Sequence, residues 1–307
     1  MPELTLVIGN YEGEQFLDEC IASARAQTTG AREIVVVDGD SKDASRERAS
    51  ELGARVLQVE NRGLAFLYNR GVEAAATEYV LLSNTDVAYD PRCFEELALA
   101  LDAFPNAFAA DARQLDWTGE HTVHALTTLR RGSLFREWFP GLRLDHVVPS
   151  DETTATVVAH GAVLLVRRSR FLELGGFDET FFLDFEDVDL CWRAWSRGWS
   201  SLHVPSATVR HFVGGVTTKA VLPRRLASSH HNILRFALKC LPARAAATVV
   251  LGEVLRAPVH PRVLPPAIAS VARELPAILR LRRQIAPSRE LLDWLLAGQP
   301  GGPTAVP

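Results

Sequence analysis

Cysteine is scarce in this chain, and its four cysteines stand far apart. No two of them form a C-x-x-C pair, which excludes a zinc ribbon and a thioredoxin-type redox motif. A small domain held together by disulfides is excluded as well, because such domains are dense in cysteine. The pattern is typical of a protein from a reducing compartment. The cysteines are Cys20, Cys93, Cys191 and Cys240.

Long apolar runs and phosphate-binding glycine motifs are also absent. The N-terminal sequence MPELTLVIGNYEGEQ has no basic residues before its short apolar stretch, so it does not resemble a signal peptide. No stretch reaches the roughly 18 uninterrupted apolar residues of a transmembrane helix, and we therefore expect a cytoplasmic protein. The first apolar run is not followed by G-x-G-x-x-G, and the chain has no Walker A sequence. These absences argue against Rossmann dehydrogenases and P-loop enzymes.

Charge is distributed unevenly along the chain. Residues 1–218 contain 20 Lys and Arg against 33 Asp and Glu, a net charge of −13. Residues 219–307 contain 13 against 4, a net charge of +9. This asymmetry predicts a basic tail that meets something anionic, which is either an anionic membrane surface or the acidic body of the protein itself. Nucleic acid is not among the partners we expect.

The first hundred residues alternate between short apolar runs and amphipathic stretches. This alternation predicts an α/β fold with a mostly parallel central sheet and helices on both faces. With 307 residues, 47% of them hydrophobic, the chain can form one large domain with a smaller appendage. The predicted strands are 4–10, 33–41, 55–61 and 78–86, and the predicted helices are 14–27, 43–53, 64–76 and one after Pro91.

The rest of the chain divides into an irregular segment, a short α/β stretch and a helical tail. Residues 114–158 mix turns, aromatic residues and charges, and we expect a functional loop or lid there. Beyond residue 218 prolines separate helices, so we divide the chain into an α/β body at 1–218 and a basic helical C-terminal extension at 219–307. We expect roughly the last ten residues to be disordered. The predicted elements are strands at 159–168, 199–205 and 207–212, and helices at 186–198, 224–240, 243–256 and 267–285.

Polar side chains stand at the ends of the four predicted N-terminal strands, where ligands bind in open parallel sheets. Such residues also cap helices, and Asp43 is assigned to capping. Asp38 and Asp86 each directly follow a buried apolar run, and we therefore assign them a functional role and not helix capping. A divalent metal that joins carboxylate to diphosphate would let this acidic crevice bind a nucleotide, with Asp86 as the first candidate ligand. The strand-end residues are Asn10, Asp38, Asn61, Asn84 and Asp86.

A second group of carboxylates lies in FDETFFLDFEDVDLCWR at 177–193. Glu186 and Asp187 open a predicted helix, where the helix dipole favours the ionised carboxylate. A carboxylate held at such a position can act as a general base. Asp189 and Arg193 are spaced four residues apart and are predicted to pair as structural support.

Five segments occur in a specific order: VVVDGDSKD, ENRGLAFLYNRG, LLSNTD, GAVLLVRRSRFLELGGFDETFFLDFEDVDLCWR and VRH. Together they resemble the family-2 glycosyltransferases of the GT-A fold, and the rhamnosyltransferase-like branch in particular, over roughly residues 3–215. Their order and spacing are highly specific, although no single motif would suffice. The resemblance implies inverting transfer of a sugar from a nucleotide-diphosphate donor to an acceptor hydroxyl in cell-surface polysaccharide synthesis.

The resemblance also implies roles for individual residues. Asp187 matches the catalytic base, with Glu186 beside it. Asp86 matches the metal position of a D-x-D-like triplet, in which Asn84 replaces the first carboxylate. His211 matches a histidine that supplies a further ligand to the metal, Mg²⁺ or Mn²⁺. The implied donor-binding residues are Asp38 at the nucleobase, Asn10 and Tyr11 in the nucleotide pocket, and Asn61, Gly63, Asn69 and Gly71 along the donor site, together with Asn84.

The resemblance implies a sugar donor and a class of acceptor. dTDP-rhamnose is the favoured donor, and the acceptor is a glycan or a lipid-linked hydroxyl. Basic amphipathic stretches such as RRLASSHHNILRFALKCL predict that the tail holds the protein peripherally on the inner face of the plasma membrane. Packing of these helices on the acidic body, or a homodimer interface, is the alternative.

Two other functions stay open from the sequence. The first is a non-catalytic sugar-nucleotide-binding or scaffold protein, against which Asp86, Asp187 and His211 argue together. The second is a sugar-nucleotide pyrophosphorylase, which needs a basic glycine-rich loop near the N-terminus. The corresponding segment here, GNYEGEQ at 9–15, is acidic.

Overall fold

A computed structural model describes residues 3–214 and 222–299, with the backbone alone for 222–227. Ten strands of this part form one sheet, in the order β10-β12-β6-β11-β4-β1-β2-β3, with β5 paired to β12 and β7 paired to β6. A separate hairpin consists of β8 (Leu126–Arg131) and β9 (Leu142–Val148). The sheet strands are β1 (Leu4–Asn10), β2 (Glu33–Asp38), β3 (Arg55–Gln58), β4 (Tyr79–Asn84), β5 (Val87–Tyr89), β6 (Ala107–Leu115), β7 (Thr122–His124), β10 (Thr154–Ala155), β11 (Val163–Arg167) and β12 (Ser200–His211).

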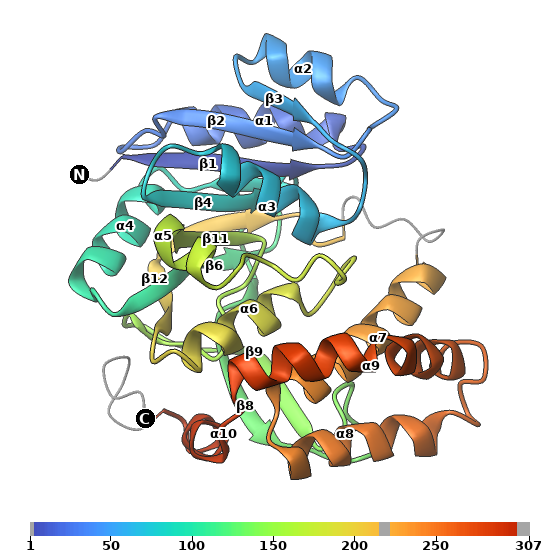
Figure 1. The fold of residues 1–307 in the computed structure, drawn as a ribbon. Coiled ribbons are helices and arrows are strands. Elements are labelled where there is room, and N and C mark those ends of the chain that lie inside the picture. Colours follow the sequence, from blue (N-terminus) through green and yellow to red (C-terminus); the bar gives the residue numbers. More distant parts are fainter. Residues whose placement is uncertain (1–2, 215–221, 300–307) are drawn as a thin grey trace.

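Helices cover both faces of the sheet and form a separate group beside it (Figure 1). The C-terminal helices gather with the β8–β9 hairpin at the end of the molecule opposite to β3. The helices are α1 (Glu14–Arg25), α2 (Ser45–Glu51), α3 (Leu64–Ala74), α4 (Cys93–Ala103), α5 (Arg168–Glu173), α6 (Glu186–Trp195), α7 (Leu222–Cys240), α8 (Ala243–Arg256), α9 (Leu264–Ile285) and α10 (Arg289–Leu296).

The predicted parallel sheet forms its N-terminal half. β1 pairs in parallel with β2 and β4, and β2 pairs in parallel with β3. Neighbouring residues of one strand enter different cores: Val35 and Val37 lie in the core on one face, and Val36 lies in the core on the other. A strand buried on both faces is continuously apolar, which explains the unbroken run IVVV.

The C-terminal half of the sheet is mixed. β11 lies between β4 and β6 and is antiparallel to both. The two strands expected at 199–205 and 207–212 are one strand, β12, whose pairing with β6 is irregular between Val204 and Thr208. The expectation of an irregular loop over 114–158 is wrong, because this segment holds β7, the β8–β9 hairpin and β10. Polar residues fill much of the hairpin, so its pattern lacks the apolar run of a buried strand.

The C-terminal extension shares a core with the α/β body. Phe236 of α7 and Leu295 of α10 belong to the same hydrophobic cluster as Trp192 of α6. α10 was not predicted from the sequence; the Ser288 side chain caps it by accepting a hydrogen bond from the Leu291 backbone. The disorder expected for the last residues falls mostly outside the described part of the chain. No helix among the described residues is long and apolar enough to cross a membrane.

Candidate active site

The carboxyl ends of β1 and β2 hold a buried hydrogen-bonded cluster around Asp38. The Asn10 amide donates to Asp38 Oδ2 at 2.6 Å, and Ser41 donates to the same carboxylate from its backbone and its hydroxyl. Asp38 and Asn10 are fully buried. The neighbouring Tyr11 is 39% exposed and is the strand-end side chain open to a ligand. The structure therefore brings the three predicted nucleotide-pocket residues to one edge of the sheet.

The loop before α3 has a conformation that requires glycine. The Gly63 φ angle is +99°, and a Cβ at this position would lie 2.3 Å from the Phe182 carbonyl oxygen. The Asn61 side chain accepts a hydrogen bond from the Gly63 backbone, and the Leu64 backbone donates to the Phe182 carbonyl. This close approach joins the donor-site loop to the segment that precedes α6.

The next two predicted donor residues, Asn69 and Gly71, make contacts within the fold. The Asn69 amide donates to the Phe177 carbonyl and accepts from the Phe177 backbone, and the residue is 6% exposed. Gly71 lies where α3 crosses β1, and a Cβ there would lie 2.1 Å from a methyl group of Val7. Both residues thus hold α3 against its neighbours, and the structure does not turn either toward an open pocket.

Asp86 and His211 come together from β-strand ends 125 positions apart in the sequence. His211 Nε2 lies 3.3 Å from Asp86 Oδ1, and the Phe212 backbone donates to the Asp86 carbonyl. His211 Nδ1 lies 2.8 Å from Gln114 Oε1. Because an amide oxygen can only accept, Nδ1 donates to Gln114, and Nε2 is the ring nitrogen that faces Asp86.

This donor set fits a divalent metal. Adjacent ligands of an octahedral ion with bonds of about 2.1 Å lie about 3 Å apart, which is close to the separation of Asp86 Oδ1 and His211 Nε2. Gln114 orients the histidine as an outer partner of a metal ligand does. Among the described residues no group of three or more His, Cys, Asp or Glu could hold a metal. The other ligands would therefore be substrate oxygens and water, as is usual for Mg²⁺.

Tyr68 of α3 connects the strand ends with the start of α6. Its hydroxyl lies 2.9 Å from Asn84 Oδ1 and 3.2 Å from the Gly161 carbonyl oxygen. Burial raises the Tyr68 pKa well above its usual value, and the negative charges of Glu186, Asp86 and Asp187 raise it further. The carboxylates predicted for metal binding and for proton transfer thus act electrostatically on one buried tyrosine.

Asp187 is held at the beginning of α6 by two backbone hydrogen bonds. Gly161 donates to its Oδ2 at 3.1 Å and Val188 donates to its Oδ1 at 2.7 Å. The side chain is buried, and burial raises the Asp187 pKa above its usual value, although both hydrogen bonds act in the opposite direction. Such a carboxylate is a stronger proton acceptor than an exposed aspartate. Glu186 lies beside it and is also buried.

An unusual backbone turn sets the direction of α6. Asp184 and Phe185 both have left-handed conformations, with φ angles of +67° and +71°. The Asn232 amide of α7 donates to the carbonyls of Leu183 and Asp184, each at 2.8 Å. Two consecutive non-glycine residues in this region are costly and persist only where surrounding structure fixes them. Asn232 supplies that support from the C-terminal extension.

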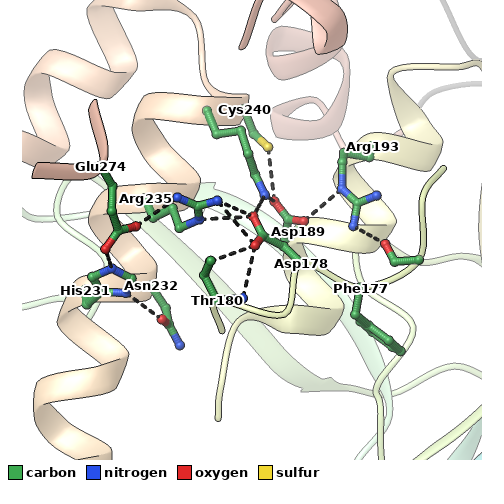
Figure 2. Close-up of polar contacts among 12 residues, drawn as sticks. Phe177, Asp178, Thr180, Asp189, Arg193, His231, Asn232, Arg235, Cys240 and Glu274 are labelled. Carbon is green, nitrogen blue, oxygen red and sulfur yellow. Dashed lines mark hydrogen bonds and ion pairs between the residues drawn. The ribbon is translucent and has the colours of Figure 1, made fainter. Parts of the chain in front are cut away.

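A buried network of charges joins α7 to α6 (Figure 2). Lys239 Nζ lies 2.5 Å from Asp178 Oδ2 and 2.7 Å from Asp189 Oδ1. Arg235 also pairs with Asp178, and Arg193 pairs with Asp189 as its spacing predicted. The structure therefore shows that Arg235 and Lys239 of α7 pack on the acidic body of the protein.

Comparison with known proteins agrees with this architecture. Residues 5–163, just over half of the chain, match the family model described as glycosyl transferase family 2. The chain belongs to this family. It is a glycosyltransferase of the rhamnosyltransferase-like type, which leaves a pyrophosphorylase without support.

Two curated relatives of this family-2 glycosyltransferase cover most of its length. An N-acetylglucosaminyl-diphospho-decaprenol L-rhamnosyltransferase of Mycobacterium tuberculosis is 28% identical over 254 residues, which cover 75% of this chain and 81% of the relative. A low-salt glycan biosynthesis hexosyltransferase of Haloferax volcanii is 26% identical over 201 residues, which cover 63% of this chain and 62% of the relative.

Solved structures confirm that the family-2 glycosyltransferase has the GT-A fold. A mannosyltransferase from Pyrobaculum calidifontis, solved with GDP-Man and Mn²⁺, superposes with a TM-score of 0.55 at 18% identity and covers 97% of this chain and 84% of that chain. GalNAc-T7, solved with UDP, GalNAc and Mn²⁺, superposes with a TM-score of 0.62 at 16% identity. That match covers 79% of this chain and 49% of GalNAc-T7, so this chain spans about half of it.

Several residues of the glycosyltransferase site were missed from the sequence. Tyr68 and Gln114 lie inside an amphipathic helix and a strand, where nothing in the local pattern distinguishes them from packing residues. Asn232 was missed because it lies in a basic amphipathic stretch that was interpreted only through its charge. A group of histidines also lies near Asp187, with the His124 and His160 rings 4.3 Å apart. The sequence around His160, AHG at the start of the strand predicted for 159–168, is too short a motif to indicate a site by itself.

Proposed function

We propose that this chain catalyses inverting, metal-dependent transfer of a sugar from a nucleoside-diphosphate sugar to a hydroxyl of a lipid-linked acceptor. The observation that carries the proposal is the arrangement around Tyr68. The Tyr68 hydroxyl lies within hydrogen-bond distance of Asn84, two residues before Asp86, and of the Gly161 carbonyl. The Gly161 backbone donates to Asp187, a buried carboxylate with a raised pKa, and Asp86 lies beside His211. One base and one metal site suffice for inverting transfer, whereas a glycosidase needs two carboxyl groups that flank the bond.

In this mechanism Asp187 is the general base. It accepts the proton of the acceptor hydroxyl while that oxygen forms a bond to the anomeric carbon from the face opposite the diphosphate. The bond between the anomeric carbon and the diphosphate breaks, and the nucleoside diphosphate leaves with the electron pair. The backbone hydrogen bonds from Gly161 and Val188 favour the ionised form of Asp187 and fix its direction before the reaction. Glu186 is the neighbouring carboxylate to test if Asp187 is not the base.

Asp86 and His211 would hold Mg²⁺ or Mn²⁺. When bound, the ion neutralises the negative charge that develops on the departing nucleoside diphosphate. Gln114 keeps the His211 lone pair available for this role through the hydrogen bond to Nδ1. Asn84 orients the Tyr68 hydroxyl beside the metal site.

The donor nucleotide is proposed to lie along the ends of β1 and β2. Tyr11 would contact it directly, while Asp38 and Asn10 form the floor of the pocket through their mutual hydrogen bond. Asn61 and Gly63 form its wall through the tight turn before α3. Asn69 and Gly71 contribute indirectly, because their contacts hold α3 in position.

The similarity to the mycobacterial rhamnosyltransferase supports dTDP-rhamnose as the donor and an N-acetylglucosaminyl-diphospho-polyprenol as the acceptor. The test is release of dTDP from dTDP-rhamnose in the presence of a short-chain polyprenyl-diphosphate N-acetylglucosamine, with Mn²⁺ and with EDTA. We expect release that depends on acceptor and metal. Donor binding without release would favour a non-catalytic sugar-nucleotide-binding protein, and full activity in EDTA would contradict the metal role.

A further inference from the structure

The outward face of α8 is apolar along much of its length. Leu251, Val254 and Leu255 share one side of the helix and are 52%, 46% and 49% exposed. The opposite side, with Ala246 and Val249, is buried against the rest of the protein. A surface helix normally turns its polar side to water, so α8 exposes the kind of face that other helices bury.

The neighbouring loop extends this apolar surface. The loop at 133–140 packs against α8, and a Cβ on Gly252 would lie 2.5 Å from Pro140. Arg256 donates to the Glu137 carbonyl and fixes the same contact. Large exposed apolar patches on a protein mark interaction sites. The loop and the turn after α8 add three exposed side chains, and we define the α8 face as Phe135, Trp138, Leu251, Val254, Leu255 and Val259.

The charges around the α8 face are mostly positive: the loop at 133–140 carries one arginine and one glutamate, Arg136 and Glu137, and the segment that follows is rich in arginine. Residues 243–288 contain only two acidic residues, Glu253 and Glu274. Glu253 is fully buried beside His230, and Glu274 pairs with His231 and Arg235. The exposed charged side chains of this segment are all arginines, and none forms an ion pair with a described residue. They are Arg244, Arg262, Arg273, Arg280 and Arg283.

We propose that the α8 face docks on an anionic membrane surface. An apolar helix face bordered by basic residues lies in the headgroup region of a bilayer with its apolar side toward the acyl chains. Each basic residue close to an anionic leaflet strengthens binding by about fivefold. Arg235 and Lys239 of α7 are not available to such a surface, because they are buried against the body.

A second copy of the chain is a poorer occupant of the same face. A two-fold dimer would place the face against itself and bring its unpaired arginines together. Like charges set against each other disfavour association. A membrane rich in phosphatidylglycerol instead offers both the apolar layer and the negative charge. This inference goes beyond the proposed sugar transfer, because it concerns where the protein binds and not what it catalyses.

The test is co-sedimentation of the full chain with vesicles of phosphatidylcholine, alone or in equal parts with phosphatidylglycerol, at low and high salt. We expect binding to the anionic vesicles at low salt, weakened by salt. Leu251→Gln with Leu255→Gln should weaken it at least about tenfold. Arg244→Gln and Arg262→Gln should each weaken it about fivefold.

The matched control is Leu99→Gln with Leu172→Gln, because these leucines of α4 and α5 are 44% and 41% exposed on the body of the protein. This variant should bind vesicles like the unchanged protein. Absence of binding to anionic vesicles, or equal binding by both double variants, would overturn the proposal. So would a dimer, detected by light scattering, that the α8 variant dissociates. Release of dTDP from dTDP-rhamnose with the short-chain acceptor in solution tests the proposed transfer separately and should be the same in every variant.

Discussion

Replacing Lys239 with methionine should lower the free energy of unfolding by about 3 kcal/mol. The ammonium group is 2% exposed and lies between Asp178 and Asp189, which are 11% and 0% exposed. Removal of one partner from a buried ion pair costs about 3–5 kcal/mol, because the other charge is left without compensation. The lower end applies here, since Arg235 still pairs with Asp178 and Arg193 with Asp189. Methionine keeps most of the side-chain volume, so a cavity adds little.

Lys42→Met is the matched control. Lys42 forms an ion pair of 2.7 Å with Asp40, which is similar in length to the pairs of Lys239, but its side chain is 72% exposed. An exposed pair contributes about 0–1 kcal/mol. Urea unfolding of both variants measures the difference, and the melting temperature of Lys239→Met should fall by about 6 °C. If both variants lose the same small amount of stability, the reasoning about the buried network is wrong.

The same network predicts a pH dependence. Burial acts to raise the Asp178 pKa, but Lys239 and Arg235 outweigh burial and hold this pKa below its usual value. A lowered pKa means that the folded protein gains stability above the unfolded value of about 3.9 and loses it as the pH falls below that value. The stability difference between the unchanged protein and Lys239→Met should therefore be constant near neutral pH and shrink in acid. A difference that grows in acid would contradict the assignment.

Four other substitutions test the site. Asp187→Asn should lower kcat by about 10²–10⁴-fold and leave donor binding intact, as measured by turnover and calorimetry; unchanged turnover would exclude it as the base. Gln114→Ala should weaken Mn²⁺ binding about 10–100-fold through His211, and a metal titration with unchanged affinity would argue against the histidine ligand. Gly71→Ala should cost about 1–3 kcal/mol in urea unfolding, because its Cβ meets β1; no loss would mean that α3 can shift freely. Asn232→Ala should lower kcat more than it raises KM, whereas an effect on stability alone would limit Asn232 to a structural role.

The parallel half of the sheet could be predicted because its strands are buried on both faces. A run such as IVVVD in β2 can enter two cores at once, and it needs no partner strand to be recognised. The carboxyl ends of such strands carry their polar residues directly after the apolar run. Asn10, Asp38 and Asp86 were predicted in this way, because the prediction depends only on their position along one strand.

The mixed half could not be predicted from local pattern. The strand at β11 was expected, but its antiparallel place between β4 and β6 depends on pairings with residues about 50 to 90 positions away. The β8–β9 hairpin exposes many polar and charged side chains, so its sequence resembles a loop. Long-range pairing of this kind leaves no periodic signal in the strand itself.

Within the candidate site, too, local motifs could be recognised from the sequence, whereas residues with contacts to distant segments could not. Asp187 could be proposed from the sequence because two carboxylates open a helix, whereas Tyr68 and Gln114 were missed because their partners come from distant segments. Asn69 and Gly71 lie in a recognisable N-x-G sequence, yet their contacts hold α3 to its neighbours. A short motif therefore indicates which residues belong to a site region, but the structure decides which of them face a ligand.

The charge of the C-terminal extension shows why a net charge could not assign its role. Arg235 and Lys239 are buried and compensate carboxylates of the body, which fixes α7 against α6. Arg244 and Arg262 contribute equally to the sum of +9 but are exposed at the ends of the apolar face of α8. The first pair stabilises the fold through interactions that salt screens little, and the second pair gives a surface potential that salt screens strongly. Raising the salt concentration should thus release the protein from anionic vesicles without unfolding it, since the two groups of basic residues respond to ionic strength in different ways.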